Sequence, residues 1–151
     1  MTAAVNLANV ATGPAFSAYQ NGTTNPAANT WTKATIDTEE FDTNSNFDNV
    51  TNYRFTPTVA GYYQVQACAQ MADVSNSSMS VSIYKNGTAF KSAQNGTSGT
   101  QTTSTIVSAI ISMNGTTDYL EMWVNINGSA TRSVNGGAAN TYFQACMIRG
   151  A

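Results

Sequence analysis

The sequence contains no histidine and few charged residues. Ser-His-Asp and Cys-His nucleophilic sites need an imidazole, as do histidine-ligated zinc and iron centres, so these classes of site are excluded. Lys, Arg, Asp and Glu make up 9% of the 151 residues, far below the roughly 25% of typical soluble proteins. The net charge of −2 provides no basic surface for nucleic acid or an anionic membrane.

Long apolar runs are also missing. No stretch approaches the roughly 20 apolar residues of a membrane-spanning helix. Residues 1–13 contain no Lys or Arg and no continuous apolar segment, unlike a secretory signal. These features predict a chain that is made in the cytoplasm without a cleaved leader.

Residue pairs that favour tight turns are abundant in the sequence. Asn-Gly pairs, which supply the positive φ angles of tight hairpins, recur along the chain at 21–22, 86–87, 95–96, 114–115, 127–128 and 135–136. The segments between them are rich in alternating or β-branched residues and show no sustained helical period. We predict strands at 14–20, 31–37, 51–56, 61–71, 78–85, 88–94, 102–113, 118–126, 129–135 and 140–149.

Two of these strands have a clear alternation. In residues 61–71, one face holds Tyr63, Val65, Ala67 and Ala69, and we predict that this face is buried in the core. In residues 118–126, the apolar face consists of Leu120, Met122, Val124 and Ile126. A helix at 104–113 is the weaker alternative, because five residues of that segment are β-branched.

Several short motifs occur in the order found in one family. They are PAFSAY at 14–19, FD at 47–48, YRFTP at 53–57, AGYY at 60–63, VSIYKNG at 81–87, NGTTDYLE at 114–121 and YFQACMI at 142–148. Together they resemble the complement-q globular heads of the tumour-necrosis-factor-like superfamily. The resemblance implies an all-β, two-sheet jelly-roll sandwich of about ten strands that forms a trimer. It covers residues 14–149, so we predict a jelly-roll domain at 14–151 and an N-terminal arm, an anchor or docking tail, at 1–13.

The resemblance also implies that one sheet faces the threefold axis. Carried over strand by strand, the trimer interface comprises Tyr62, Gln64, Gln66, Cys68, Tyr142, Gln144, Cys146 and Ile148, with Tyr119 and Trp123 beside them. Aromatic and neutral side chains on this face suit an interface core, where charge is depleted. Cys68 and Cys146 would lie on neighbouring strands on one face, where a disulfide is geometrically possible. Without a secretion signal we favour free thiols.

The acidic residues cluster near residue 40. Asp42, Asn44, Asn46 and Asp48 place oxygen-bearing side chains at alternating positions, as in a calcium loop. Phe47 and Tyr53 stand where an EF-hand needs Gly and Glu, so the segment is not an EF-hand. A solvated polar loop is the preferred interpretation and calcium the weaker one, with no other cofactor expected. Nothing marks a carboxylate pair as convergent, so a glycosidase is a minor alternative and we predict no enzyme activity.

The leading functional hypothesis is a non-catalytic, trimeric virion structural protein of a bacteriophage: a capsid decoration, head fibre or tail-tip protein. Low charge and Asn/Thr-rich turns favour it, and the arm would anchor the trimer to capsid or tail proteins, while exposed loops contact a host glycan or protein. Its location would be the virion, after synthesis in the host cytoplasm. The alternative is a secreted, extracellular or surface-bound recognition module of the complement-q kind that binds carbohydrate or protein. The sequence shows no collagen-like stalk, with Gly at every third position, of the kind that usually accompanies such heads.

Overall fold

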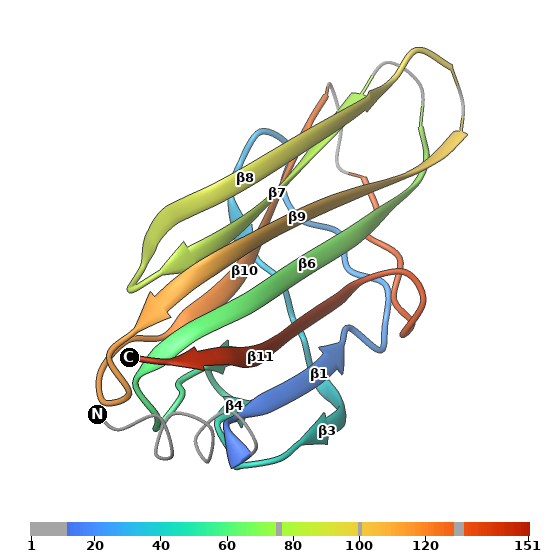
Figure 1. The fold of residues 1–151 in the computed structure, drawn as a ribbon. Coiled ribbons are helices and arrows are strands. Elements are labelled where there is room, and N and C mark those ends of the chain that lie inside the picture. The colour runs from blue at the N-terminus through green and yellow to red at the C-terminus, as the bar shows by residue number, and fades with distance from the viewer. Residues whose placement is uncertain (1–11, 75–76, 100, 129–131) are drawn as a thin grey trace.

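The computed structural model describes residues 12–74, 77–99, 101–128 and 132–151, and these form two antiparallel sheets packed face to face (Figure 1). The first sheet has the order β3-β1-β11-β6-β9. These strands span Thr38–Asp42 (β3), Ala15–Tyr19 (β1), Tyr142–Gly150 (β11), Gly61–Val74 (β6) and Gln101–Met113 (β9).

The second sheet has the order β4-β5-β10-β7-β8, and β2 also pairs with β10. The strands span Thr32–Lys33 (β2), Phe47–Asp48 (β4), Arg54–Phe55 (β5), Leu120–Asn127 (β10), Ser77–Lys85 (β7) and Thr88–Thr97 (β8). The predicted all-β, two-sheet jelly roll is confirmed. Among the described residues, no helix is both long and apolar enough to cross a membrane.

The alternating strands behave as predicted. Tyr63, Val65, Ala67 and Ala69 of β6 are fully buried. So are Leu120, Met122 and Ile126 of β10, while Val124 is 3% exposed. Residues 104–113 lie in β9, so the strand interpretation of that segment is confirmed.

Other strand predictions need correction. The predicted strands at 31–37 and 51–56 shorten to the two-residue strands β2 and β5. Of the predicted strand at 129–135, residues 129–131 lie outside the described residues, and Val134 makes only isolated bridges to Thr24 and Met71. The acidic segment holds a strand that the sequence did not reveal: β3 pairs with β1 along the edge of the first sheet. Three of its five residues, TEEFD, are acidic and have low strand propensity, so this pairing comes from the tertiary context.

Aromatic rings join the two sheets at one end of the core. Phe16 of β1 stacks on Phe47 and Phe55 of the second sheet, with ring centroids 4.5 and 4.6 Å apart. Phe143 of β11 meets Phe16 edge-on at 5.3 Å. Offset-stacked and edge-on arrangements are the favoured aromatic geometries, so this cluster stabilises the sandwich beyond the burial of its area.

Candidate interaction face

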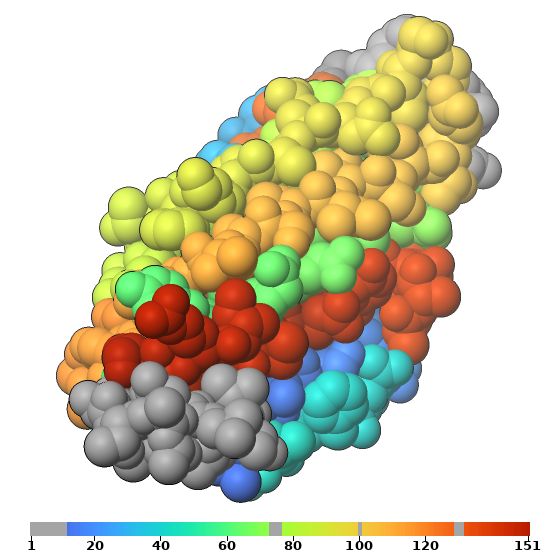
Figure 2. All heavy atoms as spheres, viewed as in Figure 1, coloured from blue at the N-terminus to red at the C-terminus, as the bar shows by residue number. Residues whose placement is uncertain are grey.

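The outer face of the first sheet collects most of the exposed large apolar side chains. Within the described part of the chain, eight large hydrophobic residues are exposed. Five of them lie on this sheet, which faces the viewer in Figures 1 and 2: Phe41, Tyr62, Ile106, Ile110 and Ile148. Monomeric proteins rarely concentrate apolar surface in this way, so the face is a candidate for contact with another molecule. We name it the interaction face.

Strand register arranges the interaction face in three rows that run from β1 across β11 and β6 to β9. The first row is Ala15, Cys146, Gln64 and Ile110, the second is Ser17, Gln144, Gln66 and Ser108, and the third is Tyr19, Tyr142, Cys68 and Ile106. None of these twelve side chains is charged.

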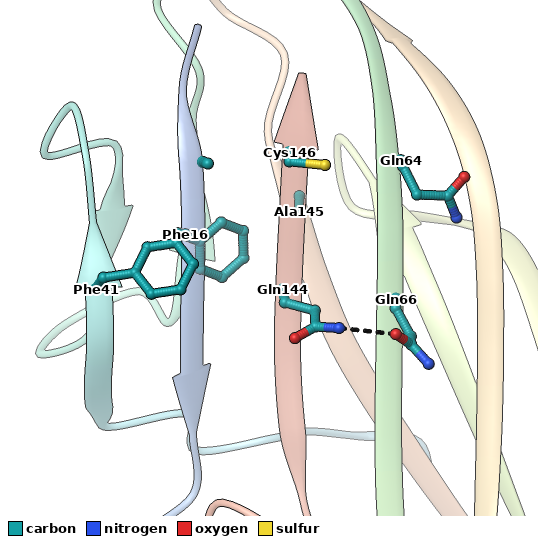
Figure 3. Close-up of a pocket in the computed structure, with 8 residues that line it drawn as sticks. Phe16, Phe41, Gln64, Gln66, Gln144, Ala145 and Cys146 are labelled. Atoms are coloured by element: carbon teal, nitrogen blue, oxygen red, sulfur yellow. Dashed lines mark hydrogen bonds between the residues drawn. The ribbon is translucent and has the colours of Figure 1, made fainter. Parts of the chain in front are cut away.

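The amides of the interaction face bond to one another within the sheet. Gln144 Nε2 donates to Gln66 Oε1 at 2.7 Å, as the dashed line in Figure 3 shows. Gln64 Nε2 donates to Ser108 Oγ at 2.6 Å. Part of the hydrogen-bonding capacity of these amides is already used, which lowers the cost of covering them with another protein surface.

A hollow of about 220 Å³ lies in the interaction face. Phe41 of β3 forms one side of it, while Cys146, Gln144, Gln64 and Gln66 come from β11 and β6 (Figure 3). Ala15, Phe16 and Ala145 complete its lining. The lining is mainly apolar and carries no charged group, so an apolar side chain suits it better than an ion or a polar ligand.

Eight of the ten predicted interface residues lie on this face, in the strands β6 and β11. Tyr119 and Trp123 do not, so the expectation that they join the other eight is wrong. Trp123 belongs to β10 in the second sheet, and Tyr119 precedes that strand, where its ring lies 4.7 Å from the Arg54 guanidinium. The alternation of residues 119–126 identified two faces of one strand but not the sheet that contains it.

Three exposed large apolar residues of the face were missed from the sequence: Phe41, Ile106 and Ile110. The signal for the two isoleucines was present, because they are in phase with exposed serines along residues 104–112 and out of phase with buried Val107 and Ile111. Phe41 had no comparable signal, since its strand was not predicted.

The two cysteines are free, as favoured from the sequence. They lie on the neighbouring strands β6 and β11, but Cys68 is opposite Tyr142 and Cys146 is opposite Gln64. This four-residue offset corresponds to about 13 Å along the strands, beyond the roughly 7 Å Cα separation that a disulfide allows. Cys68 is buried, which raises the pKa of its thiol, whereas Cys146 is exposed.

The oxygens of the candidate calcium loop serve its own turns. Asp42 accepts hydrogen bonds from the backbone N–H groups of Asn44 and Phe47. Asn46 Oδ1 accepts from Thr58. Asp48 accepts from the N–H groups of Val50, Thr51 and Asn52, so these side chains order the chain on either side of β4.

A second aromatic cluster lies on the other sheet. Tyr84 stacks on Trp123 at 4.8 Å, and Trp31 lies 6.1 Å from Tyr84. Glu121, which is 5% exposed, accepts from Trp123 Nε1 at 3.0 Å and pairs with Lys33 Nζ at 2.6 Å. We name Trp31, Tyr84 and Trp123 the aromatic platform.

Comparison with known proteins identifies the fold. No family model and no curated protein matches the sequence. Solved structures do match. The globular domain of zebrafish complement 1qA aligns at a TM-score of 0.68 and 18% identity, covering 91% of this chain and 99% of that one. Eiger TNF from S. frugiperda aligns at 0.64 and 10% identity, covering 91% and 95% of the two chains. Murine APRIL aligns at 0.66 and 9% identity, covering 89% and 99%. The fold is therefore a jelly roll of the complement-q and tumour-necrosis-factor type.

Proposed function

We propose that this chain is a non-catalytic module that forms a homotrimer through its interaction face. One observation carries the proposal: five of the eight exposed large apolar side chains of the described residues gather on one face. The three rows of this face hold no charged residue, and its glutamines are hydrogen-bonded within the sheet. An apolar core with depleted charge is typical of subunit interfaces. The resemblance to complement-q heads implies three subunits, and the lack of histidine supports a role without catalysis.

The mass of the protein in native buffer tests the trimer. We expect the mass of three chains at micromolar concentration. Ile148→Asp places a charge on the interaction face and should shift the population to monomers, because an unpaired carboxylate in an apolar interface is costly. Phe90→Asp is the matched control, since Phe90 is 43% exposed, close to the 41% of Ile148, but lies on β8 of the other sheet. A monomeric wild type, or equal effects of the two variants, would contradict the proposal.

We further propose that the trimer is a structural component of a bacteriophage virion. The low charge of the chain and its many Asn-Gly turns support this role, because a subunit of a large assembly needs little charge to prevent self-association. In this proposal residues 1–13 anchor the trimer to capsid or tail proteins. Density-gradient fractions of purified particles should contain the chain at a stoichiometric multiple of three. Its absence from particles that retain their other structural proteins would refute the virion role.

The aromatic platform favours a second candidate function, recognition of an extracellular carbohydrate or protein. Trp31 is 36% exposed and lies beside Tyr84, which stacks on Trp123, and exposed rings of this kind can stack against sugar rings. Trp31→Ala should abolish binding to any glycan or protein that the wild type captures from a panel. Phe90→Ala, which removes an exposed ring outside the aromatic platform, is the control. If the wild type captures nothing, the platform is a packing feature of the second sheet.

A further inference from the structure

A closed threefold ring joins two different patches of each subunit, because a rotation of 120° cannot superpose a patch on itself across the contact. The interaction face offers two such patches. The hollow lies toward β3 and β1, and its lining ends at Gln64 and Gln66 of β6. Ile106 and Ile110 project from β9, the strand at the opposite end of the sheet order.

Of the five exposed apolar residues on the interaction face, Ile110 is the most exposed, at 59%. It has no charged neighbour in its row, and its cross-strand partner Gln64 already lines the hollow. A branched apolar side chain that projects this far needs a complementary recess if the face is covered.

If the threefold axis runs along the strands, the rows decide which isoleucine can reach the recess. Rotation about an axis that runs along the strands keeps every atom at its height along that axis. A residue can therefore enter the neighbour's hollow only if it lies at the height of the hollow. Ile110 shares its row with Ala15, Cys146 and Gln64, all of which line the hollow. Ile106 lies four residues further along β9, about 13 Å away.

We propose that Ile110 of each subunit fills the hollow beside Cys146 of the next subunit, with the threefold axis along the strands. This inference rests on the proposed trimer and adds the register of its contact. The hollow has a volume of about 220 Å³. A water molecule in the liquid occupies about 30 Å³, and each of the four carbons of an isoleucine side chain is of similar size, so the side chain fits. Its apolar lining, with Phe41 on one side, matches this occupant in chemistry.

Cys146 makes the contact testable by disulfide trapping, because it is exposed and Cys68 is buried. In Ile110→Cys, mild oxidation should link the introduced thiol of one copy to Cys146 of the next and yield covalent dimers and trimers on a non-reducing gel. The link cannot form within one copy. Residues 110 and 146 lie on β9 and β11, with β6 between them, so they are about 10 Å apart.

Two control variants complete the experiment. Ile106→Cys places a thiol on the same strand but on another row, so it should give at least about tenfold less cross-linked product. Ile110→Cys combined with Cys146→Ser should give none. If the native mass shows a trimer but Ile110→Cys does not cross-link more than Ile106→Cys, the proposed contact is wrong and the trimer stands. If the native mass shows a monomer, both the contact and the proposed assembly are wrong.

A second measurement does not depend on the assembly of the cysteine variant. In the wild-type trimer, Ile110 should shield Cys146 from a thiol-reactive reagent. Ile110→Ala empties the hollow, and we expect Cys146 to react at least about tenfold faster in this variant than in the wild type. Equal labelling rates in two trimeric proteins would overturn the inference.

Discussion

Gly115 lies in a turn where the side chain of any larger residue would collide with the backbone of a neighbouring segment. Its φ is +70°, and a Cβ atom there would lie 2.3 Å from Ala60 N and 2.6 Å from Val59 C. Neither backbone atom can move without disturbing the start of β6. We therefore expect Gly115→Ala to lower the free energy of unfolding by more than about 2 kcal/mol.

Urea denaturation at one fixed chain concentration measures this loss. The matched control is Gly22→Ala, because nothing lies within 4 Å of a Cβ at that position. The control should change the free energy of unfolding by less than about 1 kcal/mol in either direction. Similar values for the two variants would show that the turn at Gly115 can open.

Asp48 should titrate at unusually low pH. The backbone N–H of Thr51 and the side-chain amide of Asn52 hydrogen-bond its carboxylate and lower its pKa from 3.8 to about 2. Because the folded pKa lies below the unfolded one, the associated stability is complete above about pH 4 and is lost as the pH falls toward 2. A carboxyl NMR titration of Asp48 should have its midpoint near pH 2. A midpoint near 3.8 would contradict the hydrogen bonding described here.

The short strands β4 and β5 depend on aromatic contacts with the first sheet. β4 and β5 are two residues long, yet each contributes a ring that stacks on Phe16 of β1. Truncation of Phe16 removes these contacts and leaves a cavity between the sheets. Phe16→Ala should therefore lower the free energy of unfolding by about 3–5 kcal/mol.

Chemical denaturation of Phe16→Ala checks this value. Phe90→Ala serves as the control, because the Phe90 ring is 43% exposed and should contribute no more than about 0.5 kcal/mol. A loss below about 1.5 kcal/mol for Phe16→Ala would mean that the core refills the cavity.

At the scale of the whole molecule, assembly should depend on apolar contact rather than on charge. The chain has 6 basic and 8 acidic side chains among 151 residues, and the three rows of the interaction face contain none of them. Raising the salt from about 0.05 to 0.5 M should therefore leave the trimer dissociation constant unchanged within about threefold. The melting temperature should rise with chain concentration, since folding and association are linked.

Sedimentation at several salt concentrations measures the first effect, and thermal unfolding at several chain concentrations measures the second. A trimer that dissociates at high salt would indicate that ion pairs outside the interaction face hold the subunits together. A melting temperature independent of concentration would indicate that the chain unfolds as a monomer.

The sequence predicted individual strands better than their partners. The alternation in residues 61–71 correctly separated core positions such as Val65 from outward positions such as Gln66. The resemblance, carried over strand by strand, placed Trp123 beside the predicted interface residues, although its strand β10 belongs to the second sheet. The prediction from sequence also missed β3, whose formation depends on hydrogen bonds to β1, 19 to 26 residues earlier in the chain.

The sequence by itself determined that the chain is all-β, that it has no imidazole chemistry and that Tyr63 and Met122 face the core. These conclusions depend on composition and on the two-residue period that covalent geometry imposes on each strand. Only the tertiary structure decided that Cys68 and Cys146 are offset and that Ile110 shares a row with the hollow. Register between strands arises from pairing of distant segments, so no local pattern encodes it.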